Sequence, residues 1–389
     1  MARFLIAPDS FKGTLSSFDA GRTIAEALRE SVPGARTRCM AVSDGGDGTV
    51  AALLSSIGGE EVELEVCGPA GTPVKASYAI LSDGTAAIEM SAACGARLAP
   101  EGLSPSKATT RGVGELLLDA ARRGCTEILL GLGGSATTDA GSGAASACGV
   151  KFLDRYVEAF EPTGATLDAV ESVDVSGIDP ALRGVAIRTL CAVDNPLCGA
   201  MGTSAAFSPT KGALPTVVAQ LDDNLAHLAA VIERDLGVDV LSMPCGGAGG
   251  GMAAGMAAFF GAQPHPGIDV VLDRLGFDER LGQADFVVTG EGCFDAQSLH
   301  GKVVAGIARR CKRAGVPLVA VVGTMDDALL EAGLSLGVTT FVVLNPARRP
   351  LSLVTKHPRA RLARATMALG RILAEGKEPP ALVEPPPER

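Results

Sequence analysis

The stretch ADFVVTGEGCFDAQSLHGK (284–302) carries the pattern that decides the fold: an apolar run, a glycine-rich polar loop and the start of a helix. The apolar run is rich in β-branched residues and does not alternate with polar ones, as expected of a parallel strand covered on both faces by helices. Similar runs occur at 316–324 and 338–345, with helical stretches at 302–314 and 326–333 between them. These alternating elements predict consecutive βαβ units.

The N-terminal residues repeat this pattern. Apolar runs at 3–8 and 38–46 flank a helical stretch whose capping residues are Ser17 and Asp19. Five strands drawn from the two ends of the chain predict one flavodoxin-like or Rossmann-like parallel sheet built from both termini. The predicted fold class is therefore α/β, with a second, mixed α/β domain inserted into the first.

The length of 389 residues exceeds the ~250–300 at which single cores stop growing, so we expect at least two domains. The discontinuous flavodoxin-like domain is predicted at 1–62 plus 282–375, and the inserted domain at 63–281. The proline-rich residues 376–389 are predicted to be a disordered tail.

The inserted segment mixes two kinds of pattern. Residues 62–93 alternate and contain an SDGT turn, which predicts antiparallel strands. Further strands are predicted at 126–134 and 186–195, and the apolar spacing at 215–235 predicts a helix whose apolar face is core.

One glycine-rich run imitates a dinucleotide-binding fingerprint. GGAGGGMAAG (246–255) has the glycine spacing, and Asp269 follows at a suitable distance. The preceding segment is a poor strand because Pro244 breaks it. We therefore expect a tight turn or close helix packing here.

Composition excludes several function classes. No apolar stretch approaches the ~20 residues of a membrane helix, and the first residues lack a signal-peptide pattern, so a soluble, cytoplasmic protein is expected. The net charge of −10, two tyrosines and no tryptophan argue against nucleic-acid binding. The ten cysteines and four histidines lack the spacing of a disulfide framework or zinc site.

Glycine-bearing polar loops follow five of the predicted strands, where open α/β sheets place their ligand crevices. These loops are 9–14, 43–49, 133–141, 193–199 with 209–213 behind it, and 289–302. Each loop alone is explained equally well as a turn or a helix cap, and its lysine as a solvated side chain. Five such loops together favour a common ligand site.

The residue types in these loops suit phosphoryl transfer. Glycine lets backbone N–H groups approach an anion, and a helix N-terminus adds positive partial charge. Lysines neutralise a transferring phosphoryl group, while carboxylates hold Mg²⁺ or accept a proton from the attacking hydroxyl. A Walker A loop is absent, because AQSLHGKV (296–303) has Ala296 and Val303 where glycine and Ser/Thr are required.

Five motifs in their order resemble the bacterial glycerate kinase family. They are PDSFKGTLSS (8–17), SDGGDGT (43–49), GLGGSATTDAGSG (131–143), VDNPLCG (193–199) with PTKGA (209–213), and TGEGCFDAQSLHGK (289–302). The resemblance spans about residues 4 to 345. It implies phosphorylation of D-glycerate by ATP and Mg²⁺, most often at the 2-hydroxyl, in a cleft between two α/β domains.

The resemblance also implies roles for individual residues. Lys12 and Lys302 would neutralise phosphate charge, and Asp194 would accept the proton of the glycerate hydroxyl. Substrate or phosphate would be bound by Ser10, Gly133, Gly134, Ser135, Thr137, Asp139, Asn195, Lys211 and Gln297. The candidate magnesium ligands are Asp44, Asp47, Glu291 and Asp295.

Three positions depart from the family pattern: Ala192 replaces an aspartate, Thr210 a glutamine and Cys293 an arginine. Cysteine cannot supply the planar donor fork of arginine, and Arg111 is a candidate to replace it. Two alternatives therefore stay open, a kinase for a related hydroxy-acid and a catalytically weakened ligand-binding descendant. An NAD-dependent dehydrogenase is a third hypothesis. The sequence leaves the phosphorylated hydroxyl and the oligomeric state undecided, with a homodimer open.

Overall fold

The structure is a computed structural model that describes residues 2–11, 13–346 and 356–383. The chain divides into two compact units. The first comprises Met1–Asp44, Ala51–Ser56 and Ile268–Arg389, and the second comprises Gly45–Val50 and Ile57–Gly267. The domain boundaries at 62 and 281 stay a prediction.

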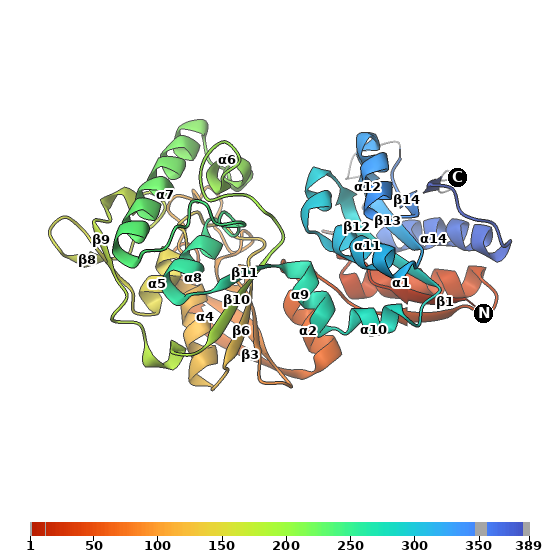
Figure 1. Ribbon diagram of the computed structural model, residues 1–389, viewed down its shortest axis with the longest axis horizontal. Helices are drawn as coiled ribbons and strands as arrows, with labels where there is room; N and C mark the ends of the chain where they lie inside the picture. Colours follow the sequence, from red (N-terminus) through yellow and green to blue (C-terminus); the bar gives the residue numbers. More distant parts are fainter. Residues whose placement is uncertain (1, 12, 347–355, 384–389) are drawn as a thin grey trace. The chain divides into compact units, whose positions relative to one another are not determined.

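Six parallel strands drawn from both ends of the chain form the sheet of the first unit (Figure 1). In spatial order they are β2 (Arg36–Cys39), β1 (Arg3–Ile6), β12 (Phe286–Phe294), β13 (Leu318–Met325), β14 (Thr340–Val343) and β15 (Leu382–Val383). Every neighbouring pair is parallel. This confirms the predicted α/β fold with a sheet built from both chain ends.

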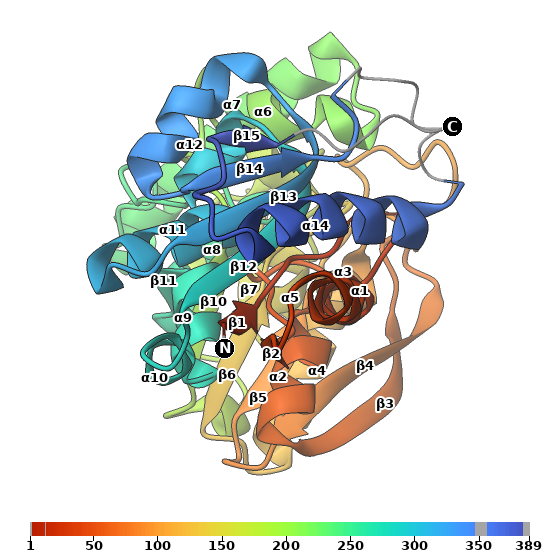
Figure 2. The same ribbon diagram turned by 90° about the vertical axis from the view of Figure 1, so that its right-hand side faces the viewer.

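Helices cover both faces of this sheet (Figure 2). Helices α1 (Ser17–Ser31) and α14 (Pro358–Ala374) share one buried cluster with alternate strand residues such as Ile6 and Val342. The residue before Val342, Phe341, points to the other face and contacts Gly333 of α12 (Leu330–Leu336). Helix α11 (Val303–Ala314) lies beside α12. Burial on both faces explains why these strands have no polar alternation.

Three details of the first unit differ from the sequence prediction. The second strand ends at Cys39, so most of 38–46 is loop, because β2 is an exposed edge strand with little apolar surface. Helix α1 is capped by Ser16, whose side chain accepts from the backbone N of Asp19. Leu382–Val383 lie in the predicted disordered tail but pair with β14, since Val383 is buried against the sheet. Residues 384–389 of that tail lie outside the described residues.

The second unit contains a mixed sheet. Its spatial order is β11 (Gln263–Pro266), β10 (Ala186–Cys191), β6 (Glu127–Gly131), β5 (Ala86–Glu89), β4 (Pro73–Leu81) and β3 (Gly59–Cys67). The pairs from β11 to β5 are parallel, and the pairs from β5 to β3 are antiparallel, as the alternation of 62–93 predicted. A small antiparallel sheet contains β8 (Ala159–Phe160), β7 (Lys151–Leu153) and β9 (Ser172–Asp174).

Among the described residues, the remaining α-helices are α2 (Thr49–Ile57), α3 (Ser91–Cys94), α4 (Arg111–Arg122), α5 (Ser142–Ala147), α6 (Thr203–Phe207), α7 (Pro215–Leu236), α8 (Met252–Phe260), α9 (Gly267–Arg274) and α10 (Phe277–Leu281). The apolar face of α7 is buried, which confirms its core role. In the part of the chain that the structure describes, no helix has both the length and the apolar character to cross a bilayer.

The glycine run before α8 serves close packing. A Cβ added to Gly250 would lie 2.1 Å from the carbonyl oxygen of Thr137, and one added to Gly255 would lie 1.9 Å from that of Ala140. No strand is formed over the described residues 239–247, so the run lacks the strand that a dinucleotide fingerprint requires. The expected turn and packing role is confirmed.

Candidate active site

A cavity of about 730 Å³ lies at the carboxyl ends of the parallel strands in the first unit. Six of the predicted site residues line it: Ser10, Asp44, Glu291, Asp295, Gln297 and Lys302. Four polar residues that the sequence interpretation did not select also line it: Asp9, Thr324, Asp326 and Asn345. The cavity therefore brings together residues from the carboxyl ends of β12 and β13 and from the loops after β1, β2, β12, β13 and β14.

Local hydrogen bonds fix the loop that follows β12. Asp295 caps the short 3₁₀ helix Ala296–His300 and accepts from the backbone N of Ser298 at 3.2 Å. The Ser298 hydroxyl accepts in return from the backbone N of Asp295 at 3.1 Å, which completes a capping box. Lys302 is the N-cap residue of α11, and its Nζ lies 3.3 Å from Asp295 Oδ1. This geometry holds a lysine and a carboxylate together on the cavity wall.

Glu291 is the most deeply buried carboxyl group of the predicted set in this cavity. Only 4% of its surface is exposed, and its Oε1 has no hydrogen-bond partner among the described residues. Burial raises the pKa of Glu291 to about 8, although nearby Lys302 acts in the opposite direction. At neutral pH the side chain is therefore mostly protonated.

The donor set of the cavity consists of hard oxygen atoms that suit Mg²⁺. Five carboxyl-bearing residues line it, namely Asp9, Asp44, Glu291, Asp295 and Asp326, beside Lys302. Over the described residues, no three His, Cys, Asp or Glu side chains form a group able to hold a metal ion. Mg²⁺ normally needs only one or two protein carboxylates together with substrate phosphates and waters, so the residues fit a shared rather than a caged ion.

Cys293 and Lys12 belong to the predicted motifs of the first unit. Cys293 lines the cavity and is exposed, so a thiol stands where the family pattern has arginine. Lys12 lies outside the described residues, and its predicted catalytic role stays a prediction.

The second unit contains the remaining predicted residues, in loops that depend on glycine for close backbone approach. A Cβ on Gly133 would lie 2.5 Å from the Cα of Gly46, and one on Gly45 would lie 2.8 Å from the carbonyl oxygen of Leu190. The SDGGDG loop can therefore cross the carboxyl ends of β6 and β10 only because these positions lack side chains.

Lys211 is held by the predicted GGSATTD loop. Its Nζ donates to Ser135 Oγ at 3.1 Å and to the carbonyl oxygen of Thr137 at 2.6 Å. Burial lowers the pKa of Lys211 to about 8, despite the opposing effect of neighbouring Cys94 and Asp139. Three predicted residues are thus joined in one hydrogen-bonded group.

Asp139 has structural partners inside the second unit. Its Oδ2 accepts from the backbone N and the hydroxyl of Thr110 at 2.9 and 2.8 Å, and its Oδ1 accepts from the backbone N of Gly141 at 3.1 Å. Burial raises the pKa of this fully buried carboxyl group, while the hydrogen bonds from Thr110 oppose the shift. These bonds fix the start of α4, and the predicted contact of Asp139 with a ligand stays a prediction.

Asp47, Asp194 and Asn195 are the other predicted polar residues of the second unit. Asp47 accepts from the Ser91 hydroxyl at 2.9 Å and pairs with Arg97 at 3.5 Å. Asp194 is exposed in the loop after β10, and the Asn195 side chain donates to the carbonyl oxygen of Met201 at 2.8 Å.

Arg111, the proposed replacement for the missing arginine, is already occupied. It forms ion pairs with Glu115 and Glu161 in the second unit. Its guanidinium therefore stabilises that unit instead of remaining available for a ligand.

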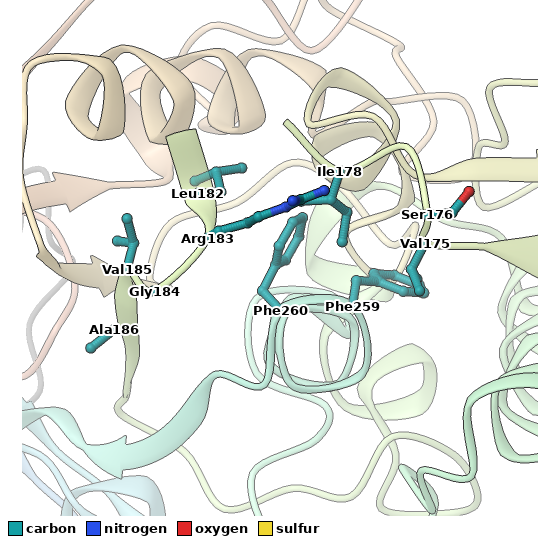
Figure 3. Close-up of a pocket in the computed structure, with 10 residues that line it drawn as sticks. All are labelled: Val175, Ser176, Ile178, Leu182, Arg183, Gly184, Val185, Ala186, Phe259 and Phe260. Carbon is teal, nitrogen blue, oxygen red and sulfur yellow. The ribbon is translucent and has the colours of Figure 1, made fainter. Parts of the chain in front are cut away.

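A second cavity, of about 540 Å³, lies elsewhere in the second unit (Figure 3). It includes Ala186 at the amino end of β10, the opposite end of the strand from the loop that contains Asp194. Phe259 and Phe260 form part of its wall, and Arg183 is the charged residue that lines it. None of the predicted site residues is among the described residues around it.

The overlooked polar residues had a sequence signal. Asn345 is the last residue of the apolar run 338–345, and Asp326 lies two residues after the end of the run at 316–324. Both stand where the loop at the carboxyl edge of a parallel sheet begins. Glu89 ends β5 and accepts from the backbone N of Gly48 and Val50 at 3.0 and 2.8 Å, a contact that no local pattern indicates.

The fold and these polar groups define an α/β protein with charged residues gathered at the carboxyl edges of its sheets. A family model described as "Glycerate kinase family" matches residues 4–374. The chain belongs to the glycerate kinase family.

Curated relatives agree with this assignment. The chain is 42% identical over 327 residues to an Escherichia coli protein named glycerate 2-kinase. The matched region covers 84% of this chain and 86% of the Escherichia coli protein. It is 38% identical over 377 residues to a Haemophilus influenzae protein named glycerate kinase, and the match covers 96% of this chain and 99% of that protein. A crystal structure named for glycerate kinase 2 of Salmonella typhimurium matches with a TM-score of 0.81 at 38% identity, covering 96% of this chain and 99% of that chain.

Proposed function

We propose that this protein transfers the γ-phosphoryl group of ATP to D-glycerate, with Mg²⁺, and that the acceptor is the 2-hydroxyl. Membership of the glycerate kinase family and the relative named glycerate 2-kinase support the reaction. The observation that carries the proposal within this chain is the cavity of the first unit, where Lys302 and Asp295 lie 3.3 Å apart among further oxygen donors.

The residues of the first unit would handle phosphate and metal. Lys302 would neutralise charge on the transferring group, and Ser10 and Gln297 would donate hydrogen bonds to phosphate or substrate. Asp44 and Asp295 fit an ion shared with the phosphates, whereas Glu291 must first release its proton. When bound, Mg²⁺ would supply charge neutralisation for the phosphate oxygens.

The residues of the second unit would accept the proton of the acceptor hydroxyl and add positive charge. Asp194 would accept the proton of the attacking hydroxyl, a role for which its exposed position after β10 is suitable. Lys211, supported by Ser135 and Thr137, would add positive charge close to the Gly133–Gly134 turn. The remaining predicted binders are Asp139 and Asn195, with Asp47 as a further metal candidate. The cytoplasmic location and the homodimer stay predictions from the sequence.

The direct test is ADP release in a coupled assay with ATP, MgCl₂ and a panel of hydroxy-acids. We expect turnover with D-glycerate, loss of turnover when EDTA removes Mg²⁺, and much weaker activity with lactate or glycolate. Preference for another acid would favour the related hydroxy-acid kinase. Thermal stabilisation by ATP or glycerate without turnover would favour the weakened descendant and contradict the kinase.

A further inference from the structure

A further cavity, of about 240 Å³, lies in the first unit. Four arginines line it: Arg3 of β1, Arg36 and Arg38 of β2, and Arg280 of α10, which lies beside these strands (Figure 2). No acidic residue is among the described residues that line it. It shares no residue with the active-site cavity and includes the amino end of β1, whereas the active-site cavity lies at the carboxyl ends of the strands. This arginine cavity is a local concentration of positive charge in a chain whose net charge is −10.

The register of the sheet gathers three of these arginines on one face. Arg3 stands opposite Arg36, and Leu5 stands opposite Arg38, in the parallel pairing of β1 with β2. Side chains alternate along a strand, so this face is the reverse of the one on which Ile6 packs with α1 and α14. Like charges that stand opposite each other in a sheet are destabilising. Negative charge close to this face therefore stabilises the arrangement.

Asp285 neutralises one of the four arginines. Its Oδ1 lies 2.7 Å from Arg3 Nη2, and its Oδ2 accepts from Arg3 Nε at 3.2 Å. Among the described residues, Arg36, Arg38 and Arg280 have no ion-pair partner. The cavity therefore has three positive charges that no protein carboxylate neutralises at ion-pair distance.

The Arg280 guanidinium is held in place close to another cation. Its Nη1 donates to the carbonyl oxygen of Leu275 at 2.5 Å, and the residue is half-buried. Burial and the positive charge of Arg38 lower the pKa of Arg280, while Glu279 acts in the opposite direction. Two guanidiniums from different elements therefore repel each other at the cavity. An anion bound between them would replace this repulsion with attraction.

We propose that the arginine cavity is a second binding site, for a small anion that contains a phosphate group. The planar guanidinium fork matches the geometry of phosphate, and its donors form charge-assisted hydrogen bonds. A phosphate group carries roughly −1.5 to −2 charge at pH 7, so several guanidiniums suit it better than they suit a single carboxylate. The cavity volume of about 240 Å³ is below the roughly 300–1,000 Å³ of pockets for drug-sized ligands, so inorganic phosphate or a short phosphate ester has the expected size. This inference does not depend on the proposed kinase function.

The test is the rate at which phenylglyoxal, a reagent that modifies accessible guanidinium groups, reacts with individual arginines of the full chain. Peptide mapping by mass spectrometry gives the rate at each position, and sodium chloride keeps the ionic strength constant. We expect inorganic phosphate to slow the modification of Arg36, Arg38 and Arg280 several-fold. Modification of Arg313, an exposed arginine in the last turn of α11, should be unchanged. Unchanged rates at the three cavity arginines, or equal slowing at Arg313, would overturn the proposal.

Further arms of this experiment identify the ligand. Slowing by both glycerol 3-phosphate and inorganic phosphate would support a site for phosphate esters, and slowing by inorganic phosphate alone would support a site for the free ion. Equal slowing by acetate would reject phosphate as the chemical class. Slowing that increases with protein concentration, without added anion, would assign the arginines to contact with a second copy of the chain and overturn the proposal.

A matched pair of variants tests the role of Arg38. Arg38→Gln removes an exposed charge from an edge strand, so the variant should fold like the wild type. Protection of Arg36 and Arg280 should then require at least about tenfold more phosphate, because one charge-assisted hydrogen-bonding partner is lost. Arg313→Gln is the control and should require the wild-type concentration. Protection of Arg280 in Arg38→Gln at the wild-type phosphate concentration would contradict the proposed site.

Discussion

At the scale of single residues, Glu291 gives the sharpest expectation. Its pKa of about 8 lies above the ordinary value of 4.5, so the folded state holds a proton that the unfolded state releases. The free energy of unfolding should therefore fall as pH rises from about 4.5 to 8. Glu291→Gln, which cannot ionise, should remove this part of the fall. The measurement is urea unfolding at a series of pH values in EDTA, with Asp295→Asn as the matched control. Identical slopes of the free energy of unfolding against pH for the wild type and Glu291→Gln would contradict the assignment.

Lys211 should show the opposite slope. Its pKa is lowered to about 8 from 10.5, so above pH 8 the folded state loses a proton that the unfolded state keeps. The free energy of unfolding should rise between about pH 8 and 10.5, and Lys211→Met should lose that rise. Chemical denaturation across this range tests it, with exposed Lys75→Met as control. A wild-type slope retained in Lys211→Met would show that another group titrates.

At the scale of elements, the turn between β7 and β8 contains an unfavourable residue. Val157 has a φ of 65° and is 75% exposed, so a β-branched residue occupies a left-handed position without compensating burial. Val157→Gly should increase the free energy of unfolding by roughly 1 kcal/mol. Glycine removes the cost of the left-handed conformation, but it also makes the unfolded chain more flexible, which offsets part of the gain. Val157→Ala should gain much less, because Cβ remains. Thermal unfolding of the three proteins measures this, and destabilisation by glycine would be the contrary result.

Strands and helices that bury apolar faces were predictable, because burial imposes their periodicity on the sequence. β12 lies within the stretch 284–302 and β14 within 338–345, and β13 and α7 each end one residue beyond the predicted stretches 316–324 and 215–235. β2 and β15 were not predicted correctly, since neither depends on a long apolar run: β2 is an exposed edge, and Leu382–Val383 gain their order from pairing with β14. Helix α1 was predicted, but a cap depends on one side-chain hydrogen bond, and so its position was misjudged by a residue.

The same distinction applies to the candidate site. Residues in glycine-bearing loops after strands were found, and six of them line one cavity. The partners that define their chemistry were not visible in the sequence, because Thr110 lies 29 residues from Asp139 and Glu89 lies 41 residues from Gly48. Burial of Glu291 and Lys211, which shifts their pKa values, also depends on residues remote in the chain.

At the scale of the whole molecule, we expect both units to be needed for turnover. Lys302→Met in the first unit and Asp194→Asn in the second should each lower kcat by roughly 10²-fold or more, through loss of a charge-neutralising donor and of the proton acceptor. Thermal unfolding should remain close to that of the wild type for exposed Asp194→Asn. Full activity of either variant in the ADP-release assay would remove that residue from the proposed mechanism.

The most direct test of the central claim is proton-coupled phosphorus NMR of the product formed from ATP, MgCl₂ and D-glycerate. Phosphate on the 2-hydroxyl is attached to a carbon with a single hydrogen, so we predict a new phosphomonoester signal split into a doublet, with ADP formed in equal amount. A triplet would place the phosphate on the 3-hydroxyl and contradict the assigned position. Release of inorganic phosphate alone, or no consumption of ATP by the folded protein, would contradict the kinase itself.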